Sequence, residues 1–363
     1  MQHPTPAPEL TIIVPVYNEA ATLAGLFASL ASQQGVSCEI VVSDGGSGDG
    51  SVATAGRLGE QHGLKVSIIS GEKGRGPQLN AGAAAASAPV LLFLHADSRF
   101  PDPLALRKGL DRFTAACHEL GSDAVAGHFA LRFTRSTTAP SLPYYFYECK
   151  ARLHRPECTH GDQGFLIARD FFDRIGPFPP FPPMLAETLL AERFREKGSW
   201  LLLPAEICTS ARRFESEGLY QRQVMNAILM NCAHLKWERF FHATAGLYRP
   251  QNHADRLDLT PFLNATADLI RQMPLKQRLA FWYATGAYVR KNAWQLAFFL
   301  DVRRDFRRGL GPGEGPARFL DRHDRLVEPL IDNAVGRLAA ALLTWFWFRL
   351  TRLHARHGGQ CST

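Results

Sequence analysis

A chain of 363 residues is long enough to bury a full core, as one large domain or two smaller ones. Hydrophobic residues make up 46% of it and charged residues 21%, a balance that excludes an intrinsically disordered chain. The net charge of +7 is unevenly spread, because residues 1–200 carry 18 Lys/Arg against 20 Asp/Glu and residues 201–363 carry 23 against 14. The partner of this basic C-terminal part could be an anionic membrane, a phosphorylated substrate or a nucleic acid. The alternative is a basic surface that contacts only solvent.

The cysteines and the apolar runs indicate where the chain resides. Seven cysteines are dispersed without a Cys-x-x-Cys pair, which predicts neither a zinc ribbon nor a disulfide framework and is typical of a reduced, cytoplasmic protein. Residues 1–9 are proline-rich and lack the features of a signal peptide, so we expect a flexible tail. No apolar run approaches the roughly 20 residues of a membrane-spanning helix.

The first hundred residues alternate between short β-branched runs and helical patterns. Strands are predicted at 10–16, 39–43, 65–69 and 90–94, and helices at 19–33, 51–61 and 76–87. Asn18 is placed to cap the first helix. This alternation predicts an α/β fold with a doubly wound, mainly parallel sheet.

Beyond Pro101 the pattern is less regular. The prediction continues with helices at 104–118, 169–175 and 185–197 and strands at 124–134 and 164–168. From residue 221 onward the pattern is helical, with breaks at Pro250, Pro274 and 309–316. We therefore expect an α/β domain over 10–215 and a basic helical extension over 216–363.

Three short segments follow directly after predicted strands, at 17–19, 44–46 and 95–97. Doubly wound sheets bind ligands at the carboxyl ends of their strands, so these segments are expected along one edge. A carboxylate such as Asp97 can hold a divalent cation there against a diphosphate, although a turn or helix-capping aspartate fits the same position. The two glycines after Asp44 would let the backbone approach a bound ligand closely. An Asp-Gly turn without a ligand fits the same residues equally well.

A third feature is the basic loop at residues 73–76, where Lys73 and Arg75 precede a helix start. Cations at such a place suit an anionic phosphate, and a solvated loop is the alternative. The chain has no GxGxxG and no GxxxxGK[ST] sequence, which disfavours a dinucleotide-binding fold and a P-loop.

Together these segments resemble a known family. Ile-Ile-Val-Pro-Val-Tyr-Asn-Glu at 12–19, Ser-Asp-Gly-Gly-Ser-Gly-Asp-Gly at 43–50, Arg-Gly-Pro-Gln-Leu-Asn-Ala-Gly at 75–82 and His-Ala-Asp at 95–97 occur in the order and spacing of family 2 glycosyltransferases of the GT-A fold. The Gly-Asp-Gln-Gly at 161–164 is similar to a later element of the arsenosugar-biosynthesis-like subgroup. The resemblance runs from about residue 10 to about residue 245.

The resemblance implies roles for the matching positions. Asp97, helped by His95, would hold Mg²⁺ or Mn²⁺, which neutralises charge on the leaving nucleoside diphosphate. Arg75 would contact the base or the pyrophosphate. The implied nucleotide-sugar site comprises Pro15, Tyr17, Glu19, Asp44, Gly45, Gly46, Arg75, Asn80, His95, Ala96 and Asp97. On the acceptor and diphosphate side, the implied residues are Gly161, Asp162, Gln163, Arg212 and Arg213.

One departure from the family pattern concerns the catalytic base. The family has a Glu-Asp pair at the start of the helix after its proline-rich turn, where this chain has Ala186 and Glu187. Glu187 is the candidate general base, although its longer side chain shifts the carboxylate by about an ångström or more. A helix N-terminal charge that pairs with the dipole is the alternative.

Near the C-terminus, an aromatic-rich segment with basic flanks occupies residues 337–356. Such a helix could lie in a membrane interface, as a peripheral contact at the inner face of the membrane, or could pack its aromatics against the α/β domain. We expect no nucleic-acid partner.

The sequence is thus interpreted as an inverting, metal-dependent glycosyltransferase that moves a sugar from a nucleotide sugar to an unidentified acceptor. A uridine diphosphate donor is the family's usual one. The competing hypothesis is a non-catalytic nucleotide-sugar-binding protein, or a membrane- or partner-docking protein, with a degenerate GT-A site.

Overall fold

The structure is a computed structural model that describes residues 7–247 and 256–358. The chain divides into two compact units, one formed by residues up to 134 together with 143–210, and the other by 135–142 together with the chain from 211 onward. The predicted break at Pro250 and residues 1–6 of the predicted tail lie outside the described residues. The domain limits predicted from the sequence, at 9/10 and 215/216, stay predictions.

The first unit is built on a seven-stranded mixed sheet with the strand order β3-β2-β1-β4-β6-β5-β7. Its strands are β1 Leu10–Val16, β2 Cys38–Asp44, β3 Val66–Ser70, β4 Val90–Phe93, β5 Val125–Thr134, β6 Phe165–Ala168 and β7 Ser199–Ser210. β6 runs antiparallel to both neighbours, and the other pairs are parallel. The predicted α/β class with a mainly parallel sheet is therefore confirmed.

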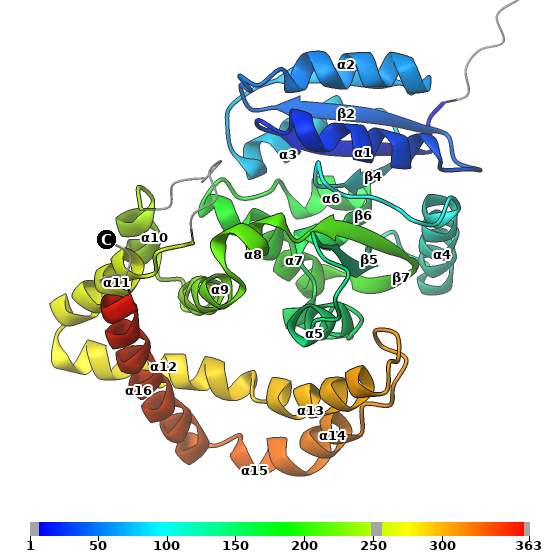
Figure 1. Cartoon of the computed structure of the whole chain (residues 1–363). Coiled ribbons are helices and arrows are strands. Elements are labelled where there is room, and N and C mark those ends of the chain that lie inside the picture. Colours follow the sequence, from blue (N-terminus) through cyan, green and yellow to red (C-terminus); the bar gives the residue numbers. More distant parts are fainter. Residues whose placement is uncertain (1–6, 248–255, 359–363) are drawn as a thin grey trace, which may run out of the picture. The chain divides into compact units, whose positions relative to one another are not determined.

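Helices cover both faces of this sheet (Figure 1). The helices up to residue 197 are α1 Ala20–Ala31, α2 Ser51–His62, α3 Arg75–Ala85, α4 Ala105–Leu120, α5 Leu142–Lys150, α6 Arg169–Ile175 and α7 Ala186–Lys197, with short 3₁₀ turns η1 Pro156–Cys158, η2 Gly161–Gln163 and η3 Pro183–Leu185. Apolar side chains of α1, α2 and α4 pack in one core, and those of α3, α6 and α7 pack in a second core. This two-sided burial explains why β1 and β4 read as continuous apolar runs rather than alternating ones.

Two elements of this unit are missing from the sequence-based prediction, α5 and β7. β7 contains Pro204, which argues against a central strand, but it lies at the end of the strand order, where a missing N–H is tolerated. Its pairing with β5 is also shifted between His128 and Ala130. α5 buries Tyr144, Tyr145 and Cys149, a set too clustered to show a clear helical period.

The predicted cap of α1 is wrong in its detail. Glu19, not Asn18, is the N-cap residue, and no side chain of that residue caps the helix. Asn18 takes a left-handed backbone conformation with φ 56°, and its side-chain oxygen accepts a hydrogen bond from the Gly48 N–H at 2.9 Å. Asp49, from the loop after β2, instead accepts from the Ala20 N–H at 3.0 Å. The loop after β2 therefore supplies a hydrogen-bond acceptor for a backbone N–H at the start of α1.

Gln78 of α3 joins the ends of two strands. Its side-chain amide is buried and donates to the carbonyls of Val16 and Ser43, both at 2.7 Å. The side-chain oxygen accepts from the Gly74 N–H at 3.3 Å. One amide thus fixes the loop before α3 against the carboxyl ends of β1 and β2.

The second unit is helical in its described part. It comprises α8 Arg212–Glu217, α9 Leu219–His234, α10 Glu238–Thr244, α11 Thr260–Gln272, α12 Leu275–Lys291, α13 Trp294–Arg307, α14 Arg318–Arg322, the π-helical turn η4 His323–Val327, α15 Glu328–Ile331 and α16 Ala334–Gly358. α16 packs along α12 at Gly286, where an added Cβ would lie 2.4 Å from the Arg337 carbonyl oxygen and 2.6 Å from the Ala341 Cβ. Phe348 of α16 also contacts Trp282, with ring centroids 5.7 Å apart.

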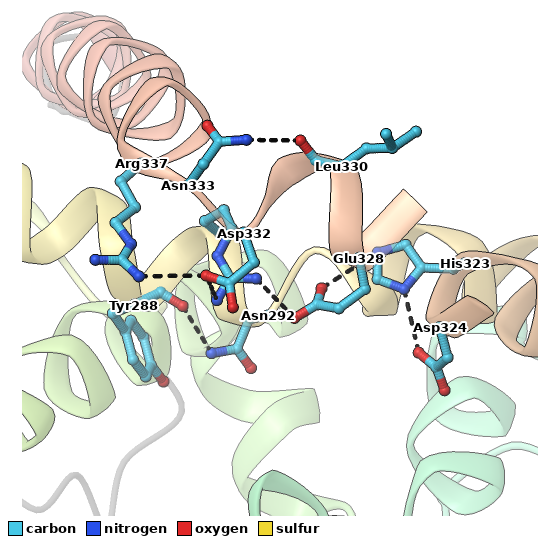
Figure 2. Close-up of polar contacts among 10 residues, drawn as sticks. Tyr288, Asn292, His323, Asp324, Glu328, Leu330, Asp332, Asn333 and Arg337 are labelled. Atoms are coloured by element: carbon cyan, nitrogen blue, oxygen red, sulfur yellow. Dashed lines mark hydrogen bonds and ion pairs between the residues drawn. The ribbon is translucent and has the colours of Figure 1, made fainter. Parts of the chain in front are cut away.

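A polar network holds the start of α16 against α12 (Figure 2). Arg290 of α12 is buried and pairs with Glu328 at 2.6 Å and Asp332 at 3.0 Å. Asp332 also accepts from Arg337 at 3.3 Å. Because a buried guanidinium is costly without carboxylate partners, this network fixes how the two helices meet.

Membrane-spanning potential and cysteine state can be stated for the described residues. None of the helices in this part of the chain is both long and apolar enough to span a bilayer. The six cysteines found there are free thiols.

His128 of β5 makes the stability of the first unit depend on pH. Its side chain is buried, and its ring centroid lies 5.9 Å from that of Trp200. Burial lowers the pKa of His128 to about 4. In the unfolded chain His128 takes up a proton near pH 6.5, whereas in the folded chain it stays neutral down to about pH 4. The free energy of unfolding is therefore highest above pH 6.5 and falls by about 3 kcal/mol as the pH drops toward 4. Urea unfolding at a series of pH values should show a shallower loss for His128→Phe than for the wild type. His118→Phe, on an exposed part of α4, should keep the wild-type slope, and equal slopes for all three proteins would contradict the assignment.

Removing the Gln78 amide should destabilise the first unit. Gln78→Leu leaves the buried Val16 and Ser43 carbonyls without a donor, so we expect the free energy of unfolding to fall by roughly 2–4 kcal/mol. The matched variant Gln61→Leu, on the exposed end of α2, should stay within about 0.5 kcal/mol of the wild type. Urea midpoints measure both, and an unchanged midpoint for Gln78→Leu would rule out the tethering role.

Candidate active site

The predicted segments after β1, β2 and β4 do meet at one edge of the sheet. β1 pairs in parallel with β2, so Val16 lies opposite Asp44, and it pairs in parallel with β4 on its other side. Tyr17, directly after β1, is half-exposed and carries the Lys73 ammonium 3.8 Å from its ring centroid. The basic loop before α3 therefore lies over the end of β1.

Asp44 shapes the loop that it begins. Its carboxylate is buried and accepts backbone hydrogen bonds from Gly46 at 3.0 Å and from Ser47 at 3.1 Å. Gly46 has a φ of +85°, which favours glycine, and an added Cβ on Gly45 would lie 3.0 Å from the Gln78 side chain. The turn predicted as the alternative is thus present, and binding of a base or ribose by Asp44 stays a prediction.

The other predicted donor-side residues at β1 are Pro15 and Glu19. Pro15 lies within β1 opposite Ser43 and is partly exposed. Glu19 begins α1, and its carboxylate accepts a hydrogen bond from the Thr22 hydroxyl at 3.0 Å.

Arg75, His95 and Glu187 form the centre of the site. Glu187 Oε1 lies 2.9 Å from His95 Nε2, and Glu187 Oε2 lies 3.3 Å from Arg75 Nη1. Arg75 Nη1 is also 3.1 Å from His95 Nε2. A proton on Nε2 donates to Glu187, and an unprotonated Nε2 accepts from Arg75, so the tautomer decides which bond forms. The structure thus joins three predicted residues from α3, the end of β4 and α7.

This arrangement makes Glu187 strongly acidic. Burial alone would raise the pKa of Glu187, but the charges of Arg75 and His95 and their hydrogen bonds outweigh burial and lower it to about 2. For Arg75, burial acts to lower the pKa, but the Glu187 charge and hydrogen bond, with smaller contributions from Asp97 and Asp162, raise it. In this state Glu187 is a counter-ion of Arg75.

Asp162 is the opposite kind of carboxylate. Burial, opposed by His95 and aided by the charges of Glu187 and Asp97, raises its pKa. Its Oδ1 atom is buried and has no hydrogen-bond partner among the described residues. Gly161 beside it allows Glu187 to approach, because an added Cβ would lie 2.3 Å from Glu187 Oε1. Gln163 is buried, accepts from the His160 N–H at 2.7 Å and donates to the Ala151 carbonyl at 3.2 Å.

Asp97 is half-buried next to the buried Ala96, and its Oδ1 lies 3.4 Å from the Thr209 hydroxyl. In the part of the chain that the structure describes, no three His, Cys, Asp or Glu side chains are grouped to hold a metal. A site with one protein carboxylate still fits Mg²⁺ or Mn²⁺, because these cations take their other oxygens from water and substrate phosphates. The Oδ1 atom of Asp162, which has no hydrogen-bond partner among the described residues, is a further oxygen of the kind that these cations take.

Two predicted groups occupy other surroundings. Asn80 donates to the Phe178 carbonyl at 2.9 Å and accepts from the Phe178 N–H at 2.8 Å, so it holds the proline-rich loop on α3. Arg212 and Arg213 are the first residues of α8 and belong to the second unit, so their role at the diphosphate stays a prediction.

The sequence-based site misses two residues that the geometry includes. Gln78 stands inside the Arg-Gly-Pro-Gln-Leu-Asn stretch of the resemblance, which gives it no predicted role, and the spacing of that stretch is the available signal. Thr209 contacts Asp97 from β7, a strand that was not predicted, so the sequence offered no signal for it.

Comparisons with known proteins bear on the first unit. The family model described as "Glycosyl transferase family 2" matches residues 11–176. An uncharacterized glycosyltransferase of Nostoc sp. is 28% identical over 178 residues, which cover 47% of this chain and 54% of that protein. The succinoglycan biosynthesis protein ExoO of Rhizobium meliloti is 31% identical over 118 residues, 32% of this chain and 33% of that protein. The match thus spans about half or less of each curated relative.

Two solved structures cover more of the chain at lower similarity. The mannosyltransferase PcManGT from Pyrobaculum calidifontis, in complex with GDP-Man and Mn²⁺, has a TM-score of 0.47 and 19% identity, with 95% of this chain and 88% of that chain covered. The S. aureus TarS fragment 1–349 in complex with UDP has a TM-score of 0.46 and 16% identity, with 87% and 91% covered.

The subgroup resemblance is not tested by these comparisons and stays a prediction. The family match, in contrast, spans β1 to α6 and contains the sheet edge at which Tyr17, Asp44 and Asp97 lie. Residues 11–176 are thus the part of the chain that resembles glycosyl transferase family 2.

Proposed function

We propose that the protein is an inverting, metal-dependent glycosyltransferase that uses a nucleotide-sugar donor. The observation that carries this proposal is the cluster of Arg75, His95 and Glu187 beside Asp97 and Asp162, at the carboxyl edge of a family 2 sheet. It supplies a cation for a diphosphate, a carboxylate for a metal and two carboxylates able to take a proton. The family's usual uridine diphosphate donor is the first one to test.

On the donor side, Asp97 would hold Mg²⁺ or Mn²⁺ together with diphosphate oxygens. The metal supplies Lewis-acid stabilisation of the leaving diphosphate. Arg75 would pair with the same diphosphate, and the Tyr17–Lys73 contact would flank the nucleotide. Pro15, Glu19 and the loop begun by Asp44 would face the base and ribose.

On the acceptor side, Glu187 is the proposed general base. An acceptor hydroxyl gives its proton to Glu187, its oxygen bonds to the anomeric carbon, and the bond from that carbon to the diphosphate breaks, with the electron pair leaving on the nucleoside diphosphate. The pKa of about 2 makes Glu187 a weak base while Arg75 holds it. A diphosphate that draws Arg75 away removes the largest attraction and raises this pKa.

Asp162 is the competing base. Its raised pKa makes Asp162 a stronger base than Glu187 in this state. Its Oδ1 atom also has no hydrogen-bond partner among the described residues. The acidity of Glu187 is also the specific observation that favours the second candidate function, a nucleotide-sugar-binding protein without transfer activity.

The acceptor is unassigned, and residues 337–356 are proposed to contact a membrane peripherally. The support is the exposure of Leu342, Leu343 and Phe346 in this segment, next to exposed arginines. No nucleic-acid partner is proposed, and the proposed location is cytoplasmic, at the inner face of the membrane.

Removing Asp97 should abolish metal-dependent nucleotide binding. With UDP and Mn²⁺ well above their dissociation constants, binding to the native state stabilises the wild type by about 3 kcal/mol, seen as a raised melting temperature. Asp97→Ala should lose the Mn²⁺-dependent part of this shift while its melting temperature without ligand stays near the wild-type value. Asp111→Ala, on an exposed face of α4, should shift like the wild type. A full Mn²⁺-dependent shift in Asp97→Ala would exclude the metal assignment, and GDP in place of UDP tests the base.

Glu187→Gln and Asp162→Asn separate the two candidate bases. If Glu187 takes the proton, Glu187→Gln lowers kcat by roughly 10²- to 10⁴-fold while UDP binding is kept or strengthened, because Arg75 loses its competing carboxylate, and Asp162→Asn has a smaller effect on kcat. Steady-state rates of transfer or donor hydrolysis, with the UDP shift as the binding control, measure this. A larger loss in Asp162→Asn would assign the base to Asp162. Donor binding without turnover over a broad panel of acceptors would favour the binding protein.

A further inference from the structure

Among the described residues, one face of α16 packs against α12 and a wider face is exposed. Ala341, Phe348 and Thr351 are buried and share the side that contacts α12. The remaining surface carries large apolar side chains at helical spacing, namely Val335, Leu338, Leu342, Leu343, Phe346, Leu350 and Leu353, which are 50% to 76% exposed. Exposed apolar residues are normal singly, but a continuous stripe of this length marks an interaction surface.

The stripe ends at a pocket lined by arginines. Arg271 of α11 and Arg349, Arg352 and Arg356 of α16, together with Leu353, line a cavity of about 370 Å³. Leu353 belongs to both the stripe and the pocket, so the apolar surface and the basic surface are continuous.

In the described part of the chain, the lining of this pocket holds four arginines and no carboxylate. Asp268 pairs with Arg271 at 2.5 Å, and its charge acts to raise the pKa of Arg352. Burial and the charges of Arg356 and Arg271 lower the pKa of Arg352. Guanidinium groups that crowd together in this way attract an anion with several acceptor oxygens.

Neighbouring contacts hold the pocket in shape. The Asn264 side-chain oxygen accepts from Arg352 at 2.9 Å and from Arg356 at 3.1 Å, which aligns two of the arginines along α11. Arg349 lies over the Trp345 ring, 5.3 Å from its centroid. An aromatic ring beside a cation, at the border of an apolar surface, is the arrangement of residues that lie at the level of lipid headgroups.

We propose that Arg271, Arg349, Arg352 and Arg356 bind the phosphate of an anionic phospholipid while the apolar stripe of α16 lies among the acyl chains. The occupant is a membrane surface, because charge and apolar area are joined here on one helix and the chain from residue 211 carries 23 Lys/Arg against 13 Asp/Glu. This inference deepens the proposed membrane contact of residues 337–356 and does not depend on sugar transfer. It adds a headgroup site, with Arg271 from another helix.

The 363-residue chain is tested on two kinds of vesicle, phosphatidylcholine alone and phosphatidylcholine with one part in three of phosphatidylglycerol. Co-sedimentation gives the partition coefficient, and a blue shift of tryptophan emission reports burial of the exposed Trp345 and Trp347. Arg349→Gln combined with Arg356→Gln removes two exposed pocket cations and should weaken binding to the anionic vesicles by roughly ten- to thirty-fold. The matched double variant Arg303→Gln with Arg307→Gln removes the same charge from exposed positions on α13 and should change binding less than about threefold.

The apolar stripe has its own variant, Leu342→Ser with Phe346→Ser, at exposed positions that leave the α12 contact intact. It should lose binding to the anionic vesicles together with the emission shift, while circular dichroism melting of all variants stays near that of the wild type. Equal losses in the two arginine double variants would overturn the headgroup site. A wild-type dimer that this serine variant dissociates, measured by light scattering, would overturn the membrane as occupant.

Nucleotide-induced thermal shifts in the same preparations, without vesicles, keep the proposals apart. A wild type that shifts with UDP but binds no vesicle contradicts the lipid site and leaves sugar transfer standing. A wild type that binds anionic vesicles through the arginine pocket but shows no nucleotide shift supports the lipid site and contradicts the transfer function.

Discussion

The parallel pairing of β1 with β2 on one side and β4 on the other is the constraint on which the candidate active site depends. It brings the carboxyl ends of three strands to one level, so that the segments at residues 17–19, 44–46 and 95–97 meet there. The Gln78 amide fastens this junction, because it binds the last carbonyl groups of β1 and β2 at once. The loops of the edge can therefore vary in sequence only where they leave these contacts intact.

The sheet edge could be predicted from the sequence because it follows from local patterns and one topological rule. Strand periodicity located β1, β2 and β4, and parallel order placed Tyr17, Asp44 and Asp97 together. The junction of Arg75 with Glu187 could not be found in this way, since 112 residues separate them and no local pattern encodes a contact of that range. The family resemblance supplied both positions, but not the ion pair that makes Glu187 acidic.

Other differences have equally local causes. Asn18 reads as a helix cap, but the loop after β2 competes for it, and Asp49 takes over the helix start. β7 could not be predicted from its sequence because a proline such as Pro204 is tolerated only on an edge strand. Whether a strand lies at the edge depends on the order of strands in the folded sheet. The helices of the second unit are predicted by their hydrophobic pattern. Which helix faces remain exposed depends on how the helices pack against one another, and the pattern does not show this.

The pairing of Arg75 with Glu187 means that the candidate active site carries its own counter-ion. Any phosphate that binds Arg75 exchanges one anionic partner for another instead of meeting a bare cation. Dissolved salt screens the bond that is lost as well as the bond that is gained, so affinity at this residue should respond weakly to ionic strength. The same exchange frees a carboxylate only when a ligand has arrived, which ties the appearance of a stronger base to occupancy of the site.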